Sequence, residues 1–402
     1  GLIMLHIKPI LSSLLRSKSG PILLLIQIIL SVAIVANASF IIQERLALMQ
    51  RDSGIKESEV LTFSLFNFDP LIDKTAQNKI DQQILRGLPN VIDATSTNML
   101  PLSGGGWSST LNLGPDPDSA KSTPQFAMYL GTDHTIETLG IKLIEGRNFY
   151  PHELKDSLDS PSRLAIISSA LAKAVWPDES PLGKVLYEGK DAQITVIGVV
   201  EKLQGAWIDS SSLENSVIQN VDYGSSSYMV RAKPEFHAEL KDAIKKALLA
   251  ENPNRVLDGF KSIEALKDSS YRDHKLMITV LTMMVVLLLL ITSLGLTGMV
   301  MFNIQRRTKQ IGTRRALGAK KRDIISYFLV ENYLICLAGG VLGGLLAIQL
   351  GQQLMKIYSL PMLDLSYPLF TVAGLFIVTT LAVYLPARKA ANISPATATR
   401  SV

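Results

Sequence analysis

Residues 306–324 read RRTKQIGTRRALGAKKRDI, and this basic stretch lies between two long apolar segments. Eight of its residues are Lys or Arg, whereas Asp323 is its only acidic residue. Basic clusters of this kind also occur in nucleic-acid patches and localisation signals. The neighbours exclude that interpretation, because residues 276–302 carry no charge and residues 324–350 carry only Glu331. Each neighbour is long enough to cross a bilayer core, which takes about 20 residues, so the sequence predicts two membrane spans joined by a cytoplasmic loop.

Two interpretations of this basic loop are open. The simpler one is a determinant of membrane topology that also touches anionic lipid headgroups. The order of residues inside the loop favours a second one, because apolar residues, cations and two glycines alternate there: Ile311, Gly312, Arg314, Arg315, Ala316, Leu317 and Gly318. A short helical segment between the two glycines would lie along the membrane surface and present two cations to the cytoplasm. We therefore predict a docking element for a soluble partner.

The composition predicts an integral membrane protein with one large polar insertion. Hydrophobic residues make up 47% of the chain, and the formal net charge is +5. The charge is unevenly distributed, since residues 43–275 carry 25 basic and 32 acidic side chains and the remainder carries 15 basic and 3 acidic ones. Basic segments that flank membrane spans and an acidic insertion place the insertion on the far side of the membrane. The single cysteine, Cys336, lies in an apolar run, so the insertion has no disulfide and fits a bacterial envelope.

These features predict four spans with both termini in the cytoplasm. In chain order the predicted segments are a cytoplasmic N-terminus (1–20), a first span (21–42), an extracytoplasmic domain with helical stalks (43–275), a second span (276–302), the cytoplasmic loop (303–325), a third span (326–350), a short outer loop (351–366), a fourth span (367–385) and a cytoplasmic tail (386–402).

The first apolar run has a competing interpretation as a secretory signal. A basic start with Lys8, Arg16 and Lys18, an apolar run and Ala36-Asn37-Ala38 also resemble a signal peptide with its cleavage site. The run continues through Ile42, which favours a membrane span. Neither Gly nor Pro occurs in residues 22–53 or in residues 261–294. We therefore expect two helical stalks, each continuous with its span.

The polar insertion contains two strand–helix–strand patterns. The first predicts a strand at 60–66, a helix at 72–84 and a strand at 91–97, and the second predicts a strand at 228–232, a helix at 236–248 and a strand at 255–260. Together they predict a split α+β subdomain of ferredoxin-like type, with an insert at about 100–225. The insert is richer in strands, which we expect at 125–130, 164–168 and 194–200, with a helix near 169–175.

Small and polar residues mark the third span. Two overlapping small-xxx-small pairs allow close approach of another helix, in the same chain or in a second copy: Gly339, Gly340, Gly343 and Gly344. Glu331 and Asn332 precede them. An ionisable residue inside a membrane is a functional candidate by default. Near the cytoplasmic end, however, Glu331 can also extend to the interface or meet the basic loop.

Several kinds of chemistry have no sequence signature here. The chain has no Gly-x-x-x-x-Gly-Lys-Ser/Thr loop to bind ATP phosphates. The five histidines show no metal-ligand spacing, and they are His6, His134, His152, His237 and His274. Residues 103–107, Ser-Gly-Gly-Gly-Trp, are not a nucleophile elbow and predict an outer loop, with Trp107 a candidate anchor for a partner or substrate. We expect no cofactor and no enzymatic activity in this chain.

The basic loop resembles a known family signature. Ile311-Gly312-Thr313-Arg314-Arg315-Ala316-Leu317-Gly318-Ala319, followed by Arg322-Asp323-Ile324, is similar to the coupling helix of the FtsX-like permeases, which include the MacB-type exporters and the lipoprotein-releasing permeases. Gln310 stands where the family usually has Glu. This departure bears on an ion pair with the ATPase at that position and not on the docking itself.

The resemblance extends over nearly the whole chain. Residues 139–149 (LGIKLIEGRNF), 176–177 (WP), 181–184 (PLGK) and 196–200 (VIGVV) look like the periplasmic domain of the MacB-type permeases. Residues 386–396 (PARKAANISPA) are similar to the closing motif of the family. These motifs are specific to the superfamily and do not indicate a substrate.

The resemblance implies the permease subunit of a bacterial ABC transporter in the inner membrane. It implies a second permease, identical or paralogous, and a separate ATPase that holds ATP and Mg and docks on these residues: Gln310, Ile311, Gly312, Arg314, Arg315, Ala316, Leu317, Gly318 and Ala319. The implied mechanism is mechanotransmission from the ATPase to the periplasmic domain. We expect export of a peptide, toxin or lipophilic compound with a periplasmic adaptor and an outer-membrane duct. Alternatives are a lipoprotein-extracting permease and an FtsX-like regulator of an envelope hydrolase.

Overall fold

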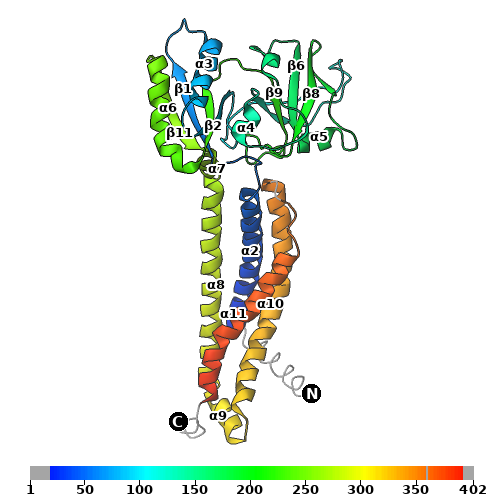
Figure 1. Ribbon diagram of the computed structural model, residues 1–402. Helices are drawn as coiled ribbons and strands as arrows, with labels where there is room; N and C mark the ends of the chain where they lie inside the picture. Colours follow the sequence, from blue (N-terminus) through cyan, green and yellow to red (C-terminus); the bar gives the residue numbers. More distant parts are fainter. Residues whose placement is uncertain (1–18, 359–360, 393–402) are drawn as a thin grey trace. The chain divides into compact units, whose positions relative to one another are not determined.

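The computed structural model describes residues 19–358 and 361–392, which form two compact units. The polar domain comprises residues 51–273, and the helical unit comprises residues up to Gln50 and from His274 onward. Figure 1 shows the elements of both units. The predictions for the basic N-terminal residues and for the end of the closing motif lie outside the described residues.

The described part of the helical unit contains four long helices and one short one. The long helices are α2 (Ser19–Met49), α8 (Arg272–Arg306), α10 (Lys321–Tyr358) and α11 (Ser366–Ala391), and the short helix α9 (Thr308–Ala316) joins α8 to α10 (Figure 1). All four long helices are long and apolar enough to cross a membrane. The 38 residues of α10 extend over about 57 Å at 1.5 Å per residue, so this helix is longer than a bilayer core of about 30 Å.

Two helices continue where the sequence predicts loops. Most of the predicted outer loop is helical, because α10 continues to Tyr358 and α11 begins at Ser366. The start of the predicted tail is also helical, since α11 passes through Pro386 to Ala391. Proline has no amide hydrogen, so Pro386 leaves the carbonyl of Ala382 without its helical donor. The Thr297 hydroxyl of α8 donates to that carbonyl instead, at 3.2 Å.

The second predicted stalk is interrupted. Its first residues belong to strand β11 (Arg255–Ser262), and a short helix α7 (Ile263–Ser270) follows. The Ser262 side chain accepts a hydrogen bond from the Ala265 amide and so caps α7. Tyr271, which is 2% exposed, lies outside both helices, and α8 begins at Arg272. The prediction of one continuous helix was therefore wrong at Tyr271, because an N-cap serine and a buried tyrosine define a separate helix.

The glycines of α10 lie at helix contacts within the chain. A Cβ on Gly339 would lie 2.5 Å from Ile28 of α2, and one on Gly343 would lie 2.8 Å from Val32 of the same helix. A Cβ on Gly340 would lie 3.0 Å from Val372 of α11, whereas one on Gly344 would lie 4.0 Å from Pro368. The helix α10 therefore packs closely against α2 on one side and against α11 on another, as small residues permit in a membrane.

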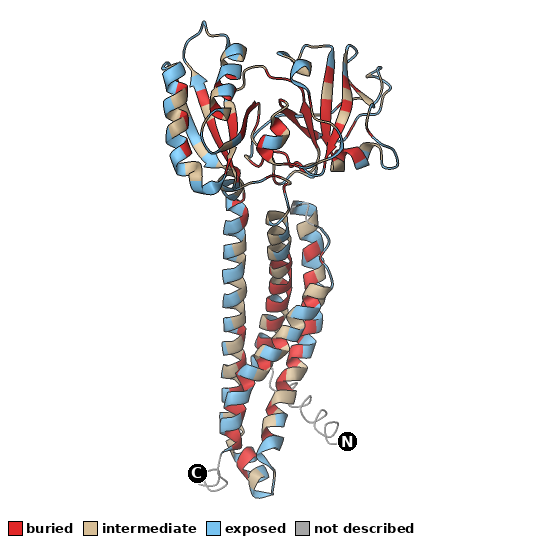
Figure 2. Ribbon diagram, in the orientation of Figure 1, coloured by how far each residue is buried: buried red, intermediate tan, exposed pale blue. Residues whose placement is uncertain are grey.

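Helix α8 is much less covered than α2. In the most apolar stretch of 18 residues of each helix, 50% of the residues are buried in α2 but only 6% in α8. Figure 2 shows this contrast. A polar contact connects the two helices, since the hydroxyls of Ser31 and Thr292 are 3.0 Å apart and both residues are buried. The open apolar surface of α8 is therefore left to lipid or to another chain.

The two predicted strand–helix–strand units of the polar domain share one sheet. The first contains β1 (Val60–Asn67), α3 (Lys74–Arg86) and β2 (Val91–Thr97), and the second contains β10 (Ser227–Ala232), α6 (His237–Glu251) and β11. The sheet order is β11-β1-β10-β2, with antiparallel neighbours. Each unit thus places a strand between the two strands of the other. A short turn of 3₁₀ helix, Pro234–Phe236, precedes α6.

The core of this sheet follows from its sequence pattern. Apolar residues of the strands, such as Phe63 and Val230, pack against the apolar stripes of the two helices, which include Leu85 and Ile244. Asp73 caps α3 by accepting hydrogen bonds from the amides of Thr75 and Ala76. The sheet and its two helices therefore form one α+β layer pair.

The insert forms a second, seven-stranded sheet. Its strands are β3 (Ser108–Ser109), β4 (Phe126–Leu130), β5 (Leu143–Gly146), β6 (Ser162–Ser168), β7 (Val185–Glu188), β8 (Ala192–Val200) and β9 (Ser216–Gln219), in the order β3-β4-β9-β6-β8-β5, with β7 paired to β8. The helices of the insert are α4 (Thr135–Leu139), α5 (Ser169–Val175) and a 3₁₀ turn at Pro151–Glu153. The sheet is mixed, because β4–β9 and β6–β8 are parallel and the other pairs are antiparallel.

Candidate functional site

The basic segment folds as the short helix α9 with a defined end. Gly318 has φ +96°, a left-handed conformation that glycine adopts without strain. The Gly318 amide donates to the Arg315 carbonyl at 3.2 Å, and the Ala319 amide donates to the Arg314 carbonyl at 3.0 Å. This pair of bonds is a Schellman motif, which ends a helix and satisfies its last carbonyls. The helix begins at Thr308, so Gly312 lies inside it and does not mark its start as we expected.

The next helix begins within a few residues of this end. The Asp323 carboxylate accepts a hydrogen bond from the Lys320 amide at 2.8 Å. An acidic side chain in the first turn that reaches back to the N-cap amide stabilises a helix start. The chain therefore turns from α9 into α10 over residues 317–320, with both helix ends capped by residues of the basic segment.

One face of α9 is fixed to the membrane helices. Ile311, 6% exposed, packs in a cluster with Val300 of α8, Phe328 of α10 and Val383 of α11. Gly312 is also buried. Three long helices therefore contribute to the cluster that holds α9 in place.

A cluster of polar and charged side chains connects the α9 segment to α10. The Arg307 guanidinium donates to the Glu331 carboxylate at 3.1 Å and to the Tyr327 hydroxyl at 3.0 Å. Arg314 lies over the Tyr327 ring at 5.0 Å from its centroid, close enough for a cation–π interaction. We call Arg307, Arg314, Tyr327 and Glu331 the basic clamp. The Glu331 side chain is 1% exposed, so Arg307 supplies the opposite charge that a carboxylate buried in a membrane needs.

A small cavity lies beside this clamp. It has a volume of about 30 Å³ and is lined by Arg307, Gln310, Arg314 and Tyr327, among others. That volume accommodates one water molecule, and the surrounding groups include hydrogen-bond donors. The clamp therefore has room for a small adjustment of its side chains.

The opposite face of α9 is exposed. The exposed residues among those predicted to contact an ATPase are Gln310, Arg314, Ala316, Leu317 and Gly318. Leu317 is the most exposed large apolar side chain of this segment, at 83%. Arg315 is half-buried and donates to the Ala319 carbonyl at 3.1 Å. Of the two arginines that the sequence predicts to be presented on this helix, Arg314 is exposed, although it also lies over the Tyr327 ring, and Arg315 is half-buried at the helix end.

Sequence reasoning missed two members of the clamp. Arg307 was counted among the basic residues without a role, and Tyr327 was not singled out. A usable signal was the spacing of Tyr327 and Glu331, since residues four apart lie on the same face of a helix. A charged residue in an otherwise apolar span also calls for a partner within reach, and the basic segment supplies one.

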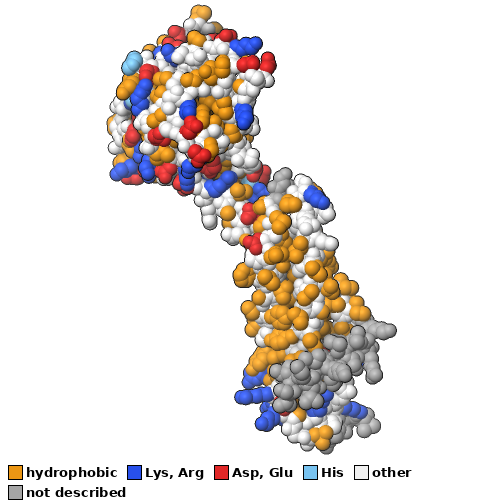
Figure 3. All heavy atoms as spheres, turned by 90° about the vertical axis from the view of Figure 1, so that its right-hand side faces the viewer, with side chains coloured by type: hydrophobic (Ala, Val, Ile, Leu, Met, Phe, Trp, Pro, Cys, Tyr) orange, Lys and Arg blue, Asp and Glu red, His pale blue; other side chains and the backbone are white. Residues whose placement is uncertain are grey.

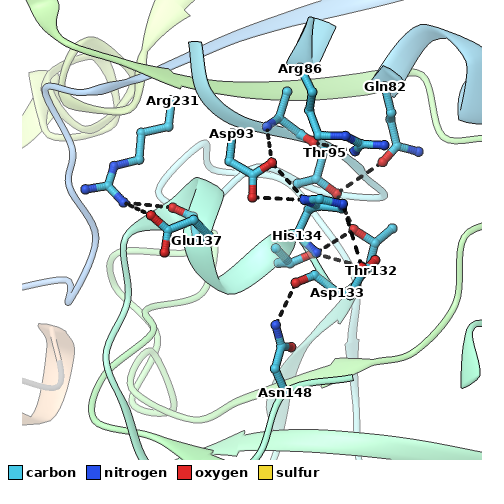
Figure 4. A network of polar contacts seen from close by, with 12 residues as sticks. Gln82, Arg86, Asp93, Thr95, Thr132, Asp133, His134, Glu137, Asn148 and Arg231 are labelled. Atoms are coloured by element: carbon cyan, nitrogen blue, oxygen red, sulfur yellow. Dashed lines mark hydrogen bonds and ion pairs between the residues drawn. The ribbon is translucent and has the colours of Figure 1, made fainter. Parts of the chain in front are cut away.

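A second polar network joins the two sheets of the polar domain (Figure 4). The His134 ring nitrogen Nδ1 lies 2.8 Å from the Asp93 carboxylate of β2. The hydroxyls of Thr95 and Thr132 are 2.9 Å apart, and Arg231 contacts Glu137 at 3.1 Å. Each pair connects the α+β sheet to the segment that carries α4.

Buried titratable groups lie beside this network. Arg86 donates to the Ala94 carbonyl at 3.0 Å, and burial lowers the pKa of its guanidinium while Asp93 and Asp133 oppose that shift. Burial raises the pKa of the Asp222 carboxyl, although the Gln82 amide, which donates to it at 3.0 Å, counteracts the rise. The network therefore links the two halves of the domain through charged and hydrogen-bonded side chains.

Two further sequence predictions concern a metal site and Trp107. Within residues 19–358 and 361–392 no cluster of three or more His, Cys, Asp and Glu side chains is arranged to hold a metal ion. Trp107 is 38% exposed and lies 6.1 Å from the Tyr223 ring. Its role as an anchor stays a prediction.

Four long apolar helices, a short basic helix between two of them and one large polar domain define a multi-pass membrane protein. Two family models match the chain. The MacB-like periplasmic core domain matches residues 25–247, and the FtsX-like permease C-terminal region matches residues 282–395. The chain therefore belongs to the MacB/FtsX-type ABC transporter permeases.

Curated relatives agree with this assignment. The macrolide export ATP-binding/permease protein MacB of Shewanella sp. (strain W3-18-1) is 26% identical over 260 residues, which cover 60% of this chain and 38% of that protein. The protein of the same name from Mannheimia succiniciproducens is 27% identical over 282 residues, covering 64% and 41%. The chain thus spans about two fifths of the length of these relatives.

Two solved structures resemble the polar domain. The periplasmic region of MacB from Actinobacillus actinomycetemcomitans has 17% identity and a TM-score of 0.35, and it covers 56% of this chain and 97% of that chain. The extracellular domain of the transporter YknZ from Gram-positive bacteria has 15% identity and a TM-score of 0.32, with 49% and 100% covered.

Proposed function

We propose that this chain is the permease subunit of a bacterial inner-membrane exporter, in which an ATPase acts on helix α9 and the permease passes the motion to its periplasmic domain. The observation that carries the proposal is the two-sided character of α9. One face is fixed to three membrane helices through Ile311, and the other exposes Leu317. A helix held in this way can transmit a push from a soluble partner to the membrane helices.

The proposed path of the motion runs along α8. The α9 anchor Ile311 contacts the cluster that includes Val300 of α8. Helix α8 is uninterrupted over 35 residues, about 52 Å at 1.5 Å per residue. It contains no proline, which is the usual cause of a sharp kink. A displacement at the basic end of α8 therefore reaches its other end, next to Tyr271, because the helix has no kink that would absorb the motion.

The membrane spans give little support for a polar substrate path through the lipid. Glu331 is the single charged residue in the four predicted spans, and Arg307 already pairs with it. We therefore propose that the substrate is a peptide, toxin or lipophilic compound taken from the periplasm, with an adaptor and an outer-membrane duct. A second permease, identical or paralogous, completes the assembly, and both termini lie in the cytoplasm. ATP and Mg belong to the ATPase subunit.

Replacing Leu317 by Glu tests the proposal. The full-length tagged permease is expressed in its native host, purified in mild detergent and analysed by mass spectrometry for ATP-binding subunits. We expect Leu317→Glu to reduce the recovered ATPase at least tenfold and to abolish the stimulation of its activity, because a charge replaces an exposed apolar contact. Leu71→Glu is the matched control, since Leu71 is 92% exposed on the polar domain.

Two results would contradict the proposal. The first is full recovery and stimulation of the ATPase by the Leu317→Glu protein. The second is recovery of an envelope hydrolase in place of an adaptor, which would favour a regulator of the FtsX type over an exporter.

A further inference from the structure

An apolar groove lies between α8 and α11 at the basic end of the helical unit. Its volume is about 460 Å³. Its walls include Met301, Ile304, Gln305, Leu385, Pro386 and Lys389. Met301 is 50% exposed and Leu385 is 65% exposed, so the groove is open toward the surroundings of the helices. No function proposed above uses this groove.

The groove has a structural cause. Pro386 cannot donate to Ala382, and Thr297 of α8 donates to that carbonyl instead, which holds the two helices together at that level. One helical turn further along α8, Met301 and then Ile304 and Gln305 face the space beside the proline ring. The groove therefore starts where the hydrogen bond joins the helices and continues toward their charged ends.

The chemistry of the groove changes along its length. At one end lie Thr297 and Met301, which belong to the second predicted membrane span. At the other end lie Gln305 and Lys389, whose neighbours in sequence include Arg306 and Arg388. The groove thus leads from membrane depth to the level of the cations, where lipid headgroups are found.

Among the described residues, no acidic side chain pairs with the cations at this end. In the described part of the chain, Arg306, Arg388 and Lys389 form no ion pair with an acidic side chain. The two acids of the neighbouring segments are already engaged, because Glu331 pairs with Arg307 and Asp323 caps α10. Figure 3 shows Lys and Arg side chains gathered at the end of the apolar surface of the helical unit.

We propose that this groove binds one acyl chain of an anionic phospholipid and that Lys389 binds its phosphate. The apolar walls select a chain of methylene groups, and the adjacent cations select a net negative headgroup, as basic pockets between membrane helices do. A free phosphate would leave the apolar walls exposed, and a zwitterionic lipid would bring a second cation to the site together with its phosphate and so add no net negative charge. The bound lipid contacts α8 and α11 beside the α9 anchor, so it would influence how firmly these helices are held together.

The test uses the full-length protein in nanodiscs of phosphatidylcholine that contain spin-labelled lipid. Electron paramagnetic resonance reports the fraction of spin-labelled phosphatidylglycerol, and of spin-labelled phosphatidylcholine, that the protein restricts. We expect a preference for phosphatidylglycerol of about fivefold, from about 1 kcal/mol per cation near the surface. Lys389→Gln should remove most of this preference. Arg322→Gln is the matched control and should keep it, because Arg322 is an exposed cation of the same membrane end that does not line the groove.

A second pair of variants tests the apolar part. Leu385→Trp and Met301→Trp fill the groove from opposite walls and should lower the restricted fraction of both lipids. If one of the two variants folds poorly, the other provides the test. Equal restriction of the two lipids by the unaltered protein would overturn the proposal, and so would an equal loss of preference in Arg322→Gln. The readout requires only that the four helices lie in a membrane, so it is independent of whether an ATPase docks on α9.

Discussion

Glu331 and Arg307 show how one charged pair can join a membrane helix to a surface segment. The carboxylate is 1% exposed and the guanidinium side chain 18% exposed. A buried pair of this kind adds little net stability compared with apolar residues, but the loss of one partner leaves an uncompensated charge. We therefore regard the pair as a device that positions α9 on α10, and as the reason that a charge is tolerated in an apolar span.

Removing both partners of this pair should cost less than the sum of the two single removals. We expect Glu331→Gln or Arg307→Gln to destabilise the helical unit by about 3 kcal/mol, at the lower end of the range for broken buried pairs because Arg307 retains some exposure. The double variant should lose less than the sum. Thermal unfolding in mild detergent measures these values, with Lys309→Gln on the exposed part of α9 as a neutral control. Additive losses would show that the two side chains do not interact.

Asp222 predicts a pH dependence in the polar domain. Burial raises the pKa of its carboxyl above the ordinary value. The native state therefore binds a proton at pH values where the unfolded chain has released it, and the stability contribution of this group falls as the pH rises toward the native pKa. The loss amounts to about 1.4 kcal/mol per unit of pKa difference.

Asp222→Asn should remove this loss. The measurement is hydrogen exchange of the β2 amides in the full-length protein, corrected for the direct effect of pH on exchange. The amides of the unaltered protein should be less protected at pH 7 than at about pH 4, and the asparagine variant should not show this difference. The Ser96 and Gln82 contacts, at 3.4 and 3.0 Å, provide hydrogen bonds that an amide can also make. An identical pH profile for both proteins would contradict the assignment.

Helix α9 illustrates which parts of an element a sequence specifies. Its end was predictable, because Gly318 follows the last apolar residue and glycine is the usual residue at this position of a helix end. Its start was not, since Gly312 is buried against other helices and tertiary packing overrides the low helix propensity of glycine. The break at Tyr271 could not be predicted either, because the prediction of a continuous helix relied only on the absence of Gly and Pro.

Gly318→Ala should weaken the end of α9. No atom lies within 4 Å of a Cβ placed at this position, so the cost comes from the left-handed backbone alone, about 1 kcal/mol. Gly318→Asn should cost less, because asparagine tolerates this conformation better than other side chains do. Hydrogen exchange of the Gly318 position and the Ala319 amide reports the outcome, and equal protection in the alanine, asparagine and unaltered proteins would argue against the Schellman end.

The arrangement of the whole chain was predictable in outline. Apolar runs and charge asymmetry indicated four spans and one polar domain, and period-two and helical patterns placed both strand–helix–strand units. Several strands of the insert were missed, for instance β5 and β9, because four-residue strands carry too little pattern to distinguish them from loops. Contact of Glu331 with the basic loop was one of the expectations and is confirmed, but which cation it meets could not be predicted, because the pairing with Arg307 depends on how α10 packs.

Helix packing in the bundle gives a matched pair of glycine variants. Gly339→Ala should destabilise the helical unit by about 1–3 kcal/mol, because the added methyl would lie 2.5 Å from Ile28 and force α2 and α10 apart. Gly298→Ala should be neutral or slightly stabilising, since nothing lies within 4 Å of its added methyl and alanine favours a helix. Thermal unfolding in detergent compares the two. Equal effects would indicate that Gly339 is not at a close helix contact.

Pro386 has a consequence for how the bundle is assembled. It frees one carbonyl, that of Ala382, and Thr297 supplies the hydroxyl that satisfies it. If α8 slid past α11 by one turn, about 5.4 Å, the hydroxyl would no longer reach the carbonyl, and an unsatisfied carbonyl in lipid costs several kcal/mol. Apolar helix faces are smooth and permit many alignments of similar energy. The hydrogen bond between the proline-freed carbonyl and the threonine therefore selects one longitudinal alignment of α8 and α11 during insertion into the membrane.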